Sequence, residues 1–322
     1  MKRGAFGCIA FLMILASTPY GAAAEWPTRT VRIVVPFAAG STPDIVARLL
    51  ADDLKDTVQQ PLIIENKPGA SGNTGTDAVA KAAPDGLTLG VSIGGPLAIN
   101  TLLFAKLPYD PRKDLTLITT LVTQPSVVAV NTNLRVDNAR DLVELIRRNP
   151  GKYAFGSIGT GSLSHLAMVA IALQSGTALV HVPFSSSPQA MTALLRNDVQ
   201  MVCLPAIAVL PQTGSGAVKI LAVSTAERSA LLPGIPTLKE AGIDVEADAW
   251  NGLIAPAGIS DATVARIGGL VAAALMSRAS RDMLTAQFME PIPASPSAFR
   301  ARIDADIARW KPVIEAAKIN LD

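Results

Sequence analysis

The sequence contains little of what catalytic and metal-binding sites are usually made of. Its 322 residues include two histidines and two cysteines, aromatic residues make up 4% and charged residues 17%. Metal sites need clustered His, Cys or carboxylate ligands, and no such cluster is visible. The absence of a basic stripe with interleaved aromatic residues argues against a nucleic-acid partner. We therefore expect no metal, no cofactor and no catalytic residues.

Residues 1–24 have the pattern of a secretory signal peptide. A basic start, "MKR", precedes the apolar stretch "GAFGCIAFLMILA", which is too short to span a bilayer. "AAA" then ends at Ala24, the expected cleavage site. Cleavage there removes Cys8 and leaves Cys203 as the one cysteine, with 26 basic and 26 acidic residues. No later apolar run reaches about 18 residues, so we expect a periplasmic protein, cleaved after Ala24.

The rest of the chain alternates apolar, β-branched runs with helical patterns. Such alternation predicts an α/β fold. The runs are apolar almost throughout, which is typical of parallel strands covered on both faces. We predict strands at 31–37, 61–66, 87–93, 126–131, 153–158, 178–184, 199–204 and 218–224.

Two segments divide these strands between two lobes. "TLITTLVTQPSVVAVN" is long and extended enough to cross from one sheet to another, and "ADAWNGLIAPAGIS" (247–260) could cross back. We predict one lobe from residues 25–122 plus 252–322 and a second from 123–251. Each lobe is expected to be a mainly parallel sheet flanked by helices.

Four loops rich in Gly, Ser and Thr each follow a predicted strand and precede a predicted helix. Ligands of open α/β sheets bind beyond the carboxyl ends of the strands, which is where these loops lie. Two fall in each predicted lobe, so they would line an interlobe cleft from both sides. Lys67, the cation beside them, is expected to point to solvent. The loops span residues 36–44, 66–75, 156–165 and 183–191.

The first loop, "PFAAGSTPD", predicts an anion site without a cationic side chain. Thr42 is the expected N-cap, Pro43 suits the first helical position, and Asp44 favours the positive end of the helix. Gly40 and the two alanines before it allow a ligand to approach the backbone closely. The free backbone N–H groups of the helix start would then point at the ligand.

Catalytic alternatives are weaker. Ser162 and His165 in "GTGSLSH" could form a serine hydrolase pair, but no G-x-S-x-G motif surrounds them. His181 lies inside an apolar run and is expected to be a packed, hydrogen-bonded residue. Cys203 also lies in an apolar strand, and we expect an inert core thiol. "PGASGNTG" is not a P-loop, because it lacks the Lys that reaches the phosphates.

At these loops the sequence resembles the Bug family, the extracytoplasmic solute-binding receptors of tripartite tricarboxylate transporters. The matching segments occur in order along the mature chain and include "TVRIVVPFAAGSTPDIVARLLA", "IIENKPGASGNTGTDAVAKAAPDGLTL", "FGSIGTGSLSHLA", "VHVPF" and "WNGLIAPAG". The resemblance implies two α/β lobes that close like a flytrap, as in periplasmic binding proteins. It also implies a small organic acid as ligand and delivery to a membrane permease of one large and one small subunit.

The resemblance implies a role for particular residues of this chain. Members of the family hold a ligand carboxylate mainly through backbone amides, small hydroxyls and water. Phe184 and Ser185 follow the "VHVP" motif and are expected to line the site as well. The residues expected to bind the ligand are Phe37, Ala38, Ala39, Gly40, Ser41, Asp44, Ser71, Asn73, Ser157, Thr160, Ser162, His165, Phe184 and Ser185.

Three departures from the family pattern bear on the ligand. Ser41 replaces a usual second glycine, and Ser185 stands where the family usually has lysine. Cys203, Leu204 and Pro205 would make one wall of the site apolar, which favours a ligand with an apolar body, such as an aromatic carboxylate. We expect a monomeric carboxylate receptor. A sensor subunit that presents its ligand to a membrane kinase and an exported serine hydrolase are the alternatives.

Overall fold

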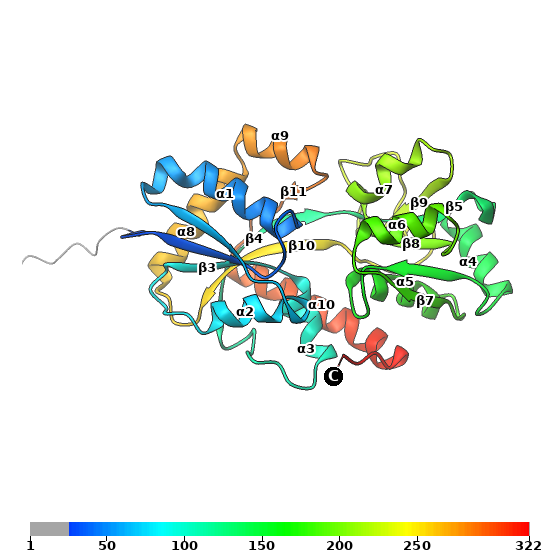
Figure 1. The fold of residues 1–322 in the computed structure, drawn as a ribbon, viewed down its shortest axis with the longest axis horizontal. Helices are drawn as coiled ribbons and strands as arrows, with labels where there is room; N and C mark the ends of the chain where they lie inside the picture. The colour runs from blue at the N-terminus through cyan, green and yellow to red at the C-terminus, as the bar shows by residue number, and fades with distance from the viewer. Residues whose placement is uncertain (1–25, 322) are drawn as a thin grey trace, which may run out of the picture.

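The computed structural model describes residues 26–321, so the predicted signal peptide and its cleavage after Ala24 lie outside the described residues. Within this range the chain forms two sheets, each with helices on both faces (Figure 1). The predicted two-lobed α/β fold is confirmed. We call the lobe with the six-stranded sheet lobe 1 and the lobe with the five-stranded sheet lobe 2.

The sheet of lobe 1 is mixed. Strand β1 pairs in parallel with β2 and β3, whereas β10 is antiparallel to β3 and β4, and β11 is antiparallel to β4. The strands lie in the order β11 (Glu290–Pro291), β4 (Leu115–Gln124), β10 (Ala249–Pro256), β3 (Thr88–Ile93), β1 (Val31–Val35) and β2 (Leu62–Asn66).

The sheet of lobe 2 is mixed as well. Strand β6 is parallel to β7 and β8, but β5 is antiparallel to β8 and β9. The prediction of parallel strands is therefore wrong for β5, which runs antiparallel to both of its neighbours, β8 and β9. Burial on both faces makes a strand apolar whatever its direction, so the pattern could not tell the two apart. The order is β7 (Val180–Pro183), β6 (Ala154–Ser157), β8 (Met201–Pro205), β5 (Ser126–Asn131) and β9 (Val218–Val223).

Helices cover both faces of each sheet because their apolar positions recur every three or four residues. In α1, for example, Val46, Leu49, Leu50 and Leu54 all lie on the buried face. One face of lobe 1 carries α1 (Thr42–Val58), α8 (Asp261–Leu275) and α9 (Arg278–Ala286), and the other α2 (Asn73–Ala80) and the start of α10 (Pro296–Ala317). One face of lobe 2 carries α4 (Ala139–Arg148) and α5 (Leu163–Gln174), and the other α6 (Ser187–Leu195) and α7 (Ala206–Thr213).

Short helical segments complete the description: η1 (Ala70–Gly72), η2 (Gly95–Ile99), α3 (Asn100–Leu103) and η3 (Thr132–Leu134). Among the described residues no single helix is long and apolar enough to cross a membrane. Helices α8 and α9 are long and apolar enough only when they are taken together, and the angle between them is 68°.

The chain passes between the lobes where the two extended segments were found. Strand β4 ends at Gln124 in one sheet and β5 begins at Ser126 in the other. Residues 224–248 lead back from β9 to β10 (Figure 1). We propose the division into 25–122 plus 252–322 and 123–251 as the domain assignment.

Helix α10 forms a third connection, which the sequence did not suggest. Its residues Phe299 and Ile303 pack in a core cluster of lobe 1. Two and three turns further on, Trp310 and Ile314 pack in a core cluster of lobe 2. One continuous helix therefore contributes to the cores of both lobes.

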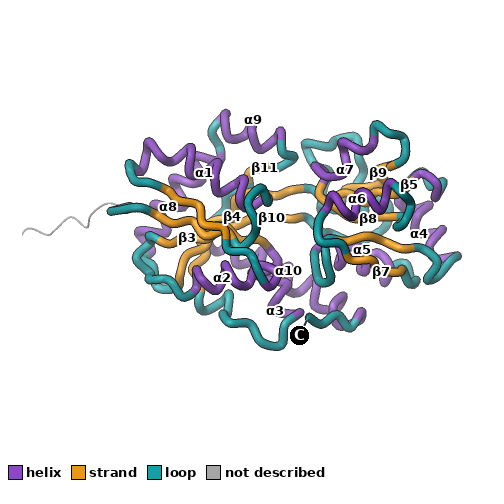
Figure 2. The backbone as a smooth tube through the Cα atoms, in the orientation of Figure 1, coloured by secondary structure: helices purple, strands orange, loops and turns teal. Residues whose placement is uncertain are grey.

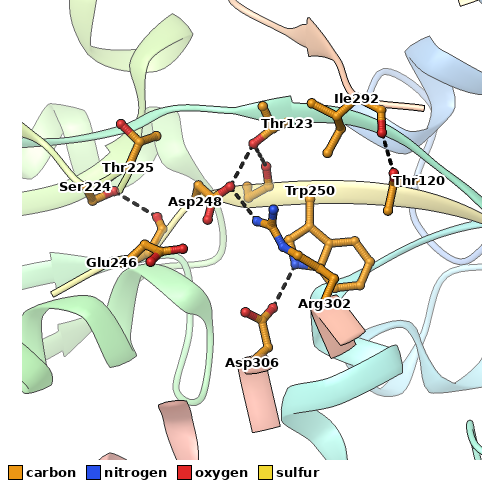
Figure 3. Close-up of polar contacts among 12 residues, drawn as sticks. Thr120, Thr123, Ser224, Thr225, Glu246, Asp248, Trp250, Ile292, Arg302 and Asp306 are labelled. Carbon is orange, nitrogen blue, oxygen red and sulfur yellow. Dashed lines mark hydrogen bonds and ion pairs between the residues drawn. The ribbon is translucent and has the colours of Figure 1, made fainter. Parts of the chain in front are cut away.

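Polar contacts fasten α10 to the returning segment (Figure 3). Arg302 forms an ion pair with Asp248, and the indole N–H of Trp250 donates to Asp306 at 2.7 Å. Arg309 contacts the other oxygen of Asp306 at 2.8 Å. Burial raises the pKa of Asp306, although the hydrogen bond from Trp250 and the charges of Arg302 and Arg309 oppose that shift. The helix and the crossing strand are thus joined by a partly buried network.

Candidate functional site

The first loop places the start of α1 at the carboxyl end of β1. Ser41 is the N-cap, with extended backbone (φ −71°, ψ 158°), and Thr42 and Pro43 are the first two helical residues. The prediction of Thr42 as N-cap is therefore wrong by one residue. Gly40 has φ +81°, in the region that favours glycine. The hydroxyl of Ser41 does not cap the helix, and its Oγ is buried without a hydrogen-bond partner within residues 26–321.

Asp44 holds this loop from beneath. Its side chain is 2% exposed and accepts the N–H of Gly40 at 2.8 Å. Arg48 donates to both of its oxygens at 2.9 and 3.0 Å, and Asn66 donates at 2.9 Å. Burial by itself would raise the pKa of this carboxyl, but the hydrogen bonds outweigh it and lower the pKa to about 2. Asp44 is therefore ionised, and its two oxygens accept hydrogen bonds from the loop and from the side chains that support it.

The second loop packs against the first. Gly72 has φ +89°, and a Cβ added there would lie 2.7 Å from Cζ of Phe37 and 2.6 Å from Cγ of Pro96. Asn66 donates to the carbonyl of Phe37 at 3.0 Å. Contact between Phe37 and Gly72 therefore brings two of the predicted loops into one surface.

The two residues predicted in the second loop face opposite ways. The side chain of Ser71 is exposed, and its carbonyl accepts from Asn100 at 3.1 Å. Asn73 is 3% exposed, and its Oδ1 accepts from Asn100 at 2.6 Å and from the hydroxyl of Tyr109 at 3.0 Å. The Oδ1 of Asn73 is thus directed inward and fixes the loop.

In lobe 2, the third loop is held by its own hydroxyl groups. Ser162 is the N-cap of α5, with its Oγ 2.6 Å from the carbonyl of Gly159 and 2.9 Å from Oγ of Ser164. Ser164 in turn accepts the N–H of Ile158 at 3.0 Å. Thr160, at the tip of the loop, is exposed.

A stack of three rings supports this loop. The rings of His165 and His181 are 3.8 Å apart, and Phe155 stacks on His181 at 4.9 Å. Nδ1 of His165 accepts the N–H of Gly161 at 3.0 Å, and Nε2 of His181 lies 2.6 Å from Oγ of Ser157. Burial, and then the neighbouring His181, lower the pKa of His165 to about 4; burial also lowers the pKa of His181. Both rings are therefore neutral at pH 7.

This geometry does not form the Ser162–His165 pair of a hydrolase. The hydroxyl of Ser162 caps the helix and contacts Gly159, while the Nδ1 of His165 is taken by a backbone N–H. Ser157 does contact the ring of His181, but the residue is 0% exposed and its hydroxyl lies 3.1 Å from the carbonyl of Gly159, so it too is engaged within the loop.

The fourth loop runs alongside the third. The N–H of Phe184 donates to the carbonyl of Ser157 at 2.9 Å, and its ring lies over Gly156, where an added Cβ would come within 3.2 Å. The N–H and Oγ of Ser185 both donate to Oε1 of Gln189, at 3.2 and 2.8 Å. The loop therefore offers a half-buried aromatic ring and an exposed serine.

The predicted apolar wall is partly wrong. Cys203 and Leu204 are 1% and 0% exposed and belong to the two core clusters on opposite faces of the sheet. Pro205 alone of the three is half-exposed. Cys203 is a free thiol in the core, as expected, and burial raises its pKa to about 12.

The loops of the two lobes lie on the sides that face each other (Figure 2). The cations nearest the first two loops are engaged: Arg48 pairs with Asp44, and Lys67 contacts Glu65 at 3.0 Å. Lys67 was expected to point to solvent and is instead half-exposed in this pair. Both cations are thus paired with carboxylates, and within the first loop the N–H groups of Gly40 and Ser41 are bonded to Asp44 and to the carbonyl of Ala38.

Residues 46–320 match the model of a known family, described as the tripartite tricarboxylate transporter family receptor. The chain belongs to this family. It is 33% identical to the protein BugT of Bordetella pertussis over 291 residues, which cover 90% of this chain and 89% of BugT. It is accordingly a solute-binding receptor of the Bug type, as the sequence resemblance implied.

Two solved structures of relatives agree with this assignment. The chain is similar to Rpa4515 of R. palustris with adipate, at 33% identity and a TM-score of 0.81, covering 92% of this chain and 99% of that one. It is also similar to MatC of Rhodopseudomonas palustris with bound malate, at 31% identity and a TM-score of 0.76, covering 90% and 100%.

The supporting residues of the loops were missed at the level of sequence. Arg48 and Asn66, which neutralise and fix Asp44, were not singled out. The spacing of Asp44 and Arg48, four residues apart in one helix, was a signal that could have found the pair. Asn66, Asn100 and Tyr109 approach from other elements, and no local pattern marks them.

Proposed function

We propose that this receptor captures a small organic carboxylate between its lobes and delivers it to a tripartite tricarboxylate-type permease of one large and one small subunit. The observation that carries the proposal is the start of α1. Backbone N–H groups of a helix start carry a partial positive charge and attract anions. Here they lie beside a buried hydroxyl, that of Ser41, without a partner among the described residues.

The four loops supply the remaining donors. The proposed ligand-binding residues are those expected from the sequence, with Asp44, Asn73, Ser157, Ser162 and His165 acting by holding their loops. Relatives solved with adipate and with malate support a carboxylate ligand. We further propose that the protein acts without catalysis, as a monomer in the periplasm, after cleavage behind Ala24.

A thermal-shift panel of mono-, di- and tricarboxylates and aromatic acids tests the ligand class. A ligand present at a hundred times its dissociation constant stabilises the folded state by about 2.7 kcal/mol. We expect at least one acid to raise the Tm by several degrees, and neutral amides of the same acids to have no effect. Absence of any shift, in protein freed of co-purified ligand by unfolding and refolding, would contradict the proposal.

Mass spectrometry of small molecules released from the freshly purified, denatured protein would identify the natural ligand. We expect an organic acid in a near one-to-one ratio with protein. Release of a sugar, an amine or a cation instead would overturn the proposed ligand class.

A further inference from the structure

Asn251 has a hydrogen-bond donor that the fold does not use. It lies in β10, in the segment that returns to lobe 1, and is 2% exposed. Its Nδ2 is buried and finds no partner anywhere in residues 26–321. Leaving a buried donor unpaired costs about 1–3 kcal/mol, so such groups are uncommon and need an explanation.

The register of the sheet puts Asn251 at the end where the first loop begins. Asn251 pairs with Ile93, the last residue of β3, and with Val122 of β4. Strand β3 is parallel to β1, with Val34 beside Gly90. Continuing that register by three residues places Phe37, at the start of the first loop, beside Ile93.

The alternation of side chains puts Asn251 on the face of the sheet that α1 covers. Gly252 faces α10, because an added Cβ would meet the ring of Phe299. Leu253 packs in the core cluster that contains the buried face of α1. Neighbouring residues of a strand point to opposite faces of the sheet, and every second residue points to the same face. Asn251 therefore shares the face of Leu253, which is the face covered by α1.

A direct contact shows that α1 begins over this part of the sheet. Oγ1 of Thr42, the first residue of α1, donates to Oε1 of Gln124 at 3.3 Å. Gln124 lies two residues after Val122 in β4, on the same face as Asn251 and Val122. The ladder between β10 and β4 is also irregular between Asn251 and Gly252. Such bulges are frequent beside functional sites, where they redirect a side chain.

We propose that Asn251 is a ligand-contacting residue that determines specificity, with its Nδ2 donating to an oxygen of the bound acid at the start of α1. The inference rests on the proposed function, because it needs an acid bound at that helix start. It adds a neutral donor from the sheet to the backbone donors of the helix and the hydroxyl of Ser41. The carboxylate would then accept hydrogen bonds from Asn251 in the sheet and from the start of α1, without a cationic side chain.

Two variants test this inference by isothermal titration with the acids that shift the Tm of the wild type, adipate and malate included. Asn251→Leu keeps the volume and removes the donor. Because it also removes an unpaired buried polar group, we expect the unliganded protein to melt at an unchanged or higher temperature. We expect its affinity to fall roughly tenfold to a hundredfold, the range for a hydrogen bond to a charged group.

Asn251→Asp places a carboxylate against the ligand anion, and we expect a larger loss of affinity than for Asn251→Leu. The matched control is Asn131→Asp in β5 of lobe 2, where the amide donates to the carbonyl of Leu194 at 2.8 Å. That variant should lower the Tm and leave the affinity within twofold of the wild type.

The possible outcomes separate the two proposals. If the wild type binds no acid in the panel, the proposed function fails and this inference fails with it. If the wild type binds and Asn251→Leu binds within twofold, the inference alone is overturned. A fall in the Tm of unliganded Asn251→Leu with unchanged affinity would assign Asn251 a purely structural role and likewise overturn it.

Discussion

The two lobes fix the loops of the proposed ligand site by different chemistry. In lobe 1 the loop rests on an ionised carboxylate, Asp44, whose charge is matched by Arg48. In lobe 2 the loop rests on neutral groups, the stacked rings of His165 and His181. Both arrangements leave no net charge beneath the loop. An anion approaching either lobe would therefore meet no unpaired carboxylate beneath the loop.

Because the supporting groups differ, the two loops should respond differently to a fall in pH. The carboxylate of lobe 1 stays ionised down to a pH of about 2. The rings of lobe 2 are neutral only while the pH stays above their lowered pKa values. The two halves of the site should therefore lose their support in separate pH ranges.

Ser41→Asp should have the largest effect, because it adds a negative charge at the proposed anion site of lobe 1. Like charges placed together in an interface cost several kcal/mol, so we expect the affinity to fall by roughly a hundredfold or more. Isothermal titration measures it. Ser277→Asp, at the N-cap of α9, adds the same charge at another helix start and serves as control. Equal affinity of Ser41→Asp and wild type would remove the first loop from the site.

Acid should weaken lobe 2 first. The pKa of His165 is lowered from 6.5 to about 4, so the unfolded chain takes up its proton at higher pH than the folded one. The stabilising contribution is complete above pH 6.5 and is lost as the pH falls toward 4. We expect the Tm to drop by roughly 5 °C over this range. The drop should be smaller in His165→Gln, and an identical pH profile would show that the stack does not titrate as described.

Asp44→Asn should have a smaller effect on stability, confined to lobe 1. The substitution replaces an ionised acceptor by an amide that cannot serve Gly40, Arg48 and Asn66 together, and we expect the Tm to fall by roughly 3 °C at pH 7. The lowered pKa contributes stability above about pH 3.8 that is lost as the pH falls through about 2, so the variant should show less acid sensitivity between those values.

Asp52→Asn is the control for that variant, since Asp52 lies on the same helix with a 77% exposed side chain. It should melt like the wild type at every pH. A Tm of Asp44→Asn equal to that of the wild type would mean that the buried carboxylate does not order the loop.

Cys203 should give the smallest effect. Its thiol is buried in the core of lobe 2 with its pKa raised to about 12, so we expect no alkylation by iodoacetamide in the folded protein. Cys203→Ala should bind the same acids with the same affinity. Rapid labelling of the native protein, or protection of the thiol by ligand, would instead put Cys203 in the wall of the site.

Much of the fold could be predicted from the sequence because long apolar runs mark buried strands. The eight predicted strands are present, and the chain crosses between the sheets within the first extended segment and just before most of the second. Strand direction was not encoded, as β5 shows, because a strand buried on both faces is apolar either way. The role of α10 in both cores was also hidden, since helical periodicity gives the buried face but not the lobe it packs on.

The loops of the site were predicted by their composition, but their internal bonding was not. Ser and Thr at a helix start can face the ligand or the backbone, and only the fold decides between them. Asn251 gave no local signal, because a single polar residue in an apolar strand is equally compatible with a satisfied core amide. The position of Asn251 near the start of α1 follows from the pairing of β10 with β3 and β4, which a single sequence does not reveal.

Helix α10 is anchored in the cores of both lobes, and this limits how the lobes can move relative to one another. Rotation of one lobe about the long axis of the molecule would disrupt the packing of Phe299 in the core of lobe 1 or of Trp310 in the core of lobe 2. Any closure of the lobes on a solute would therefore have to bend α10 between those two anchors.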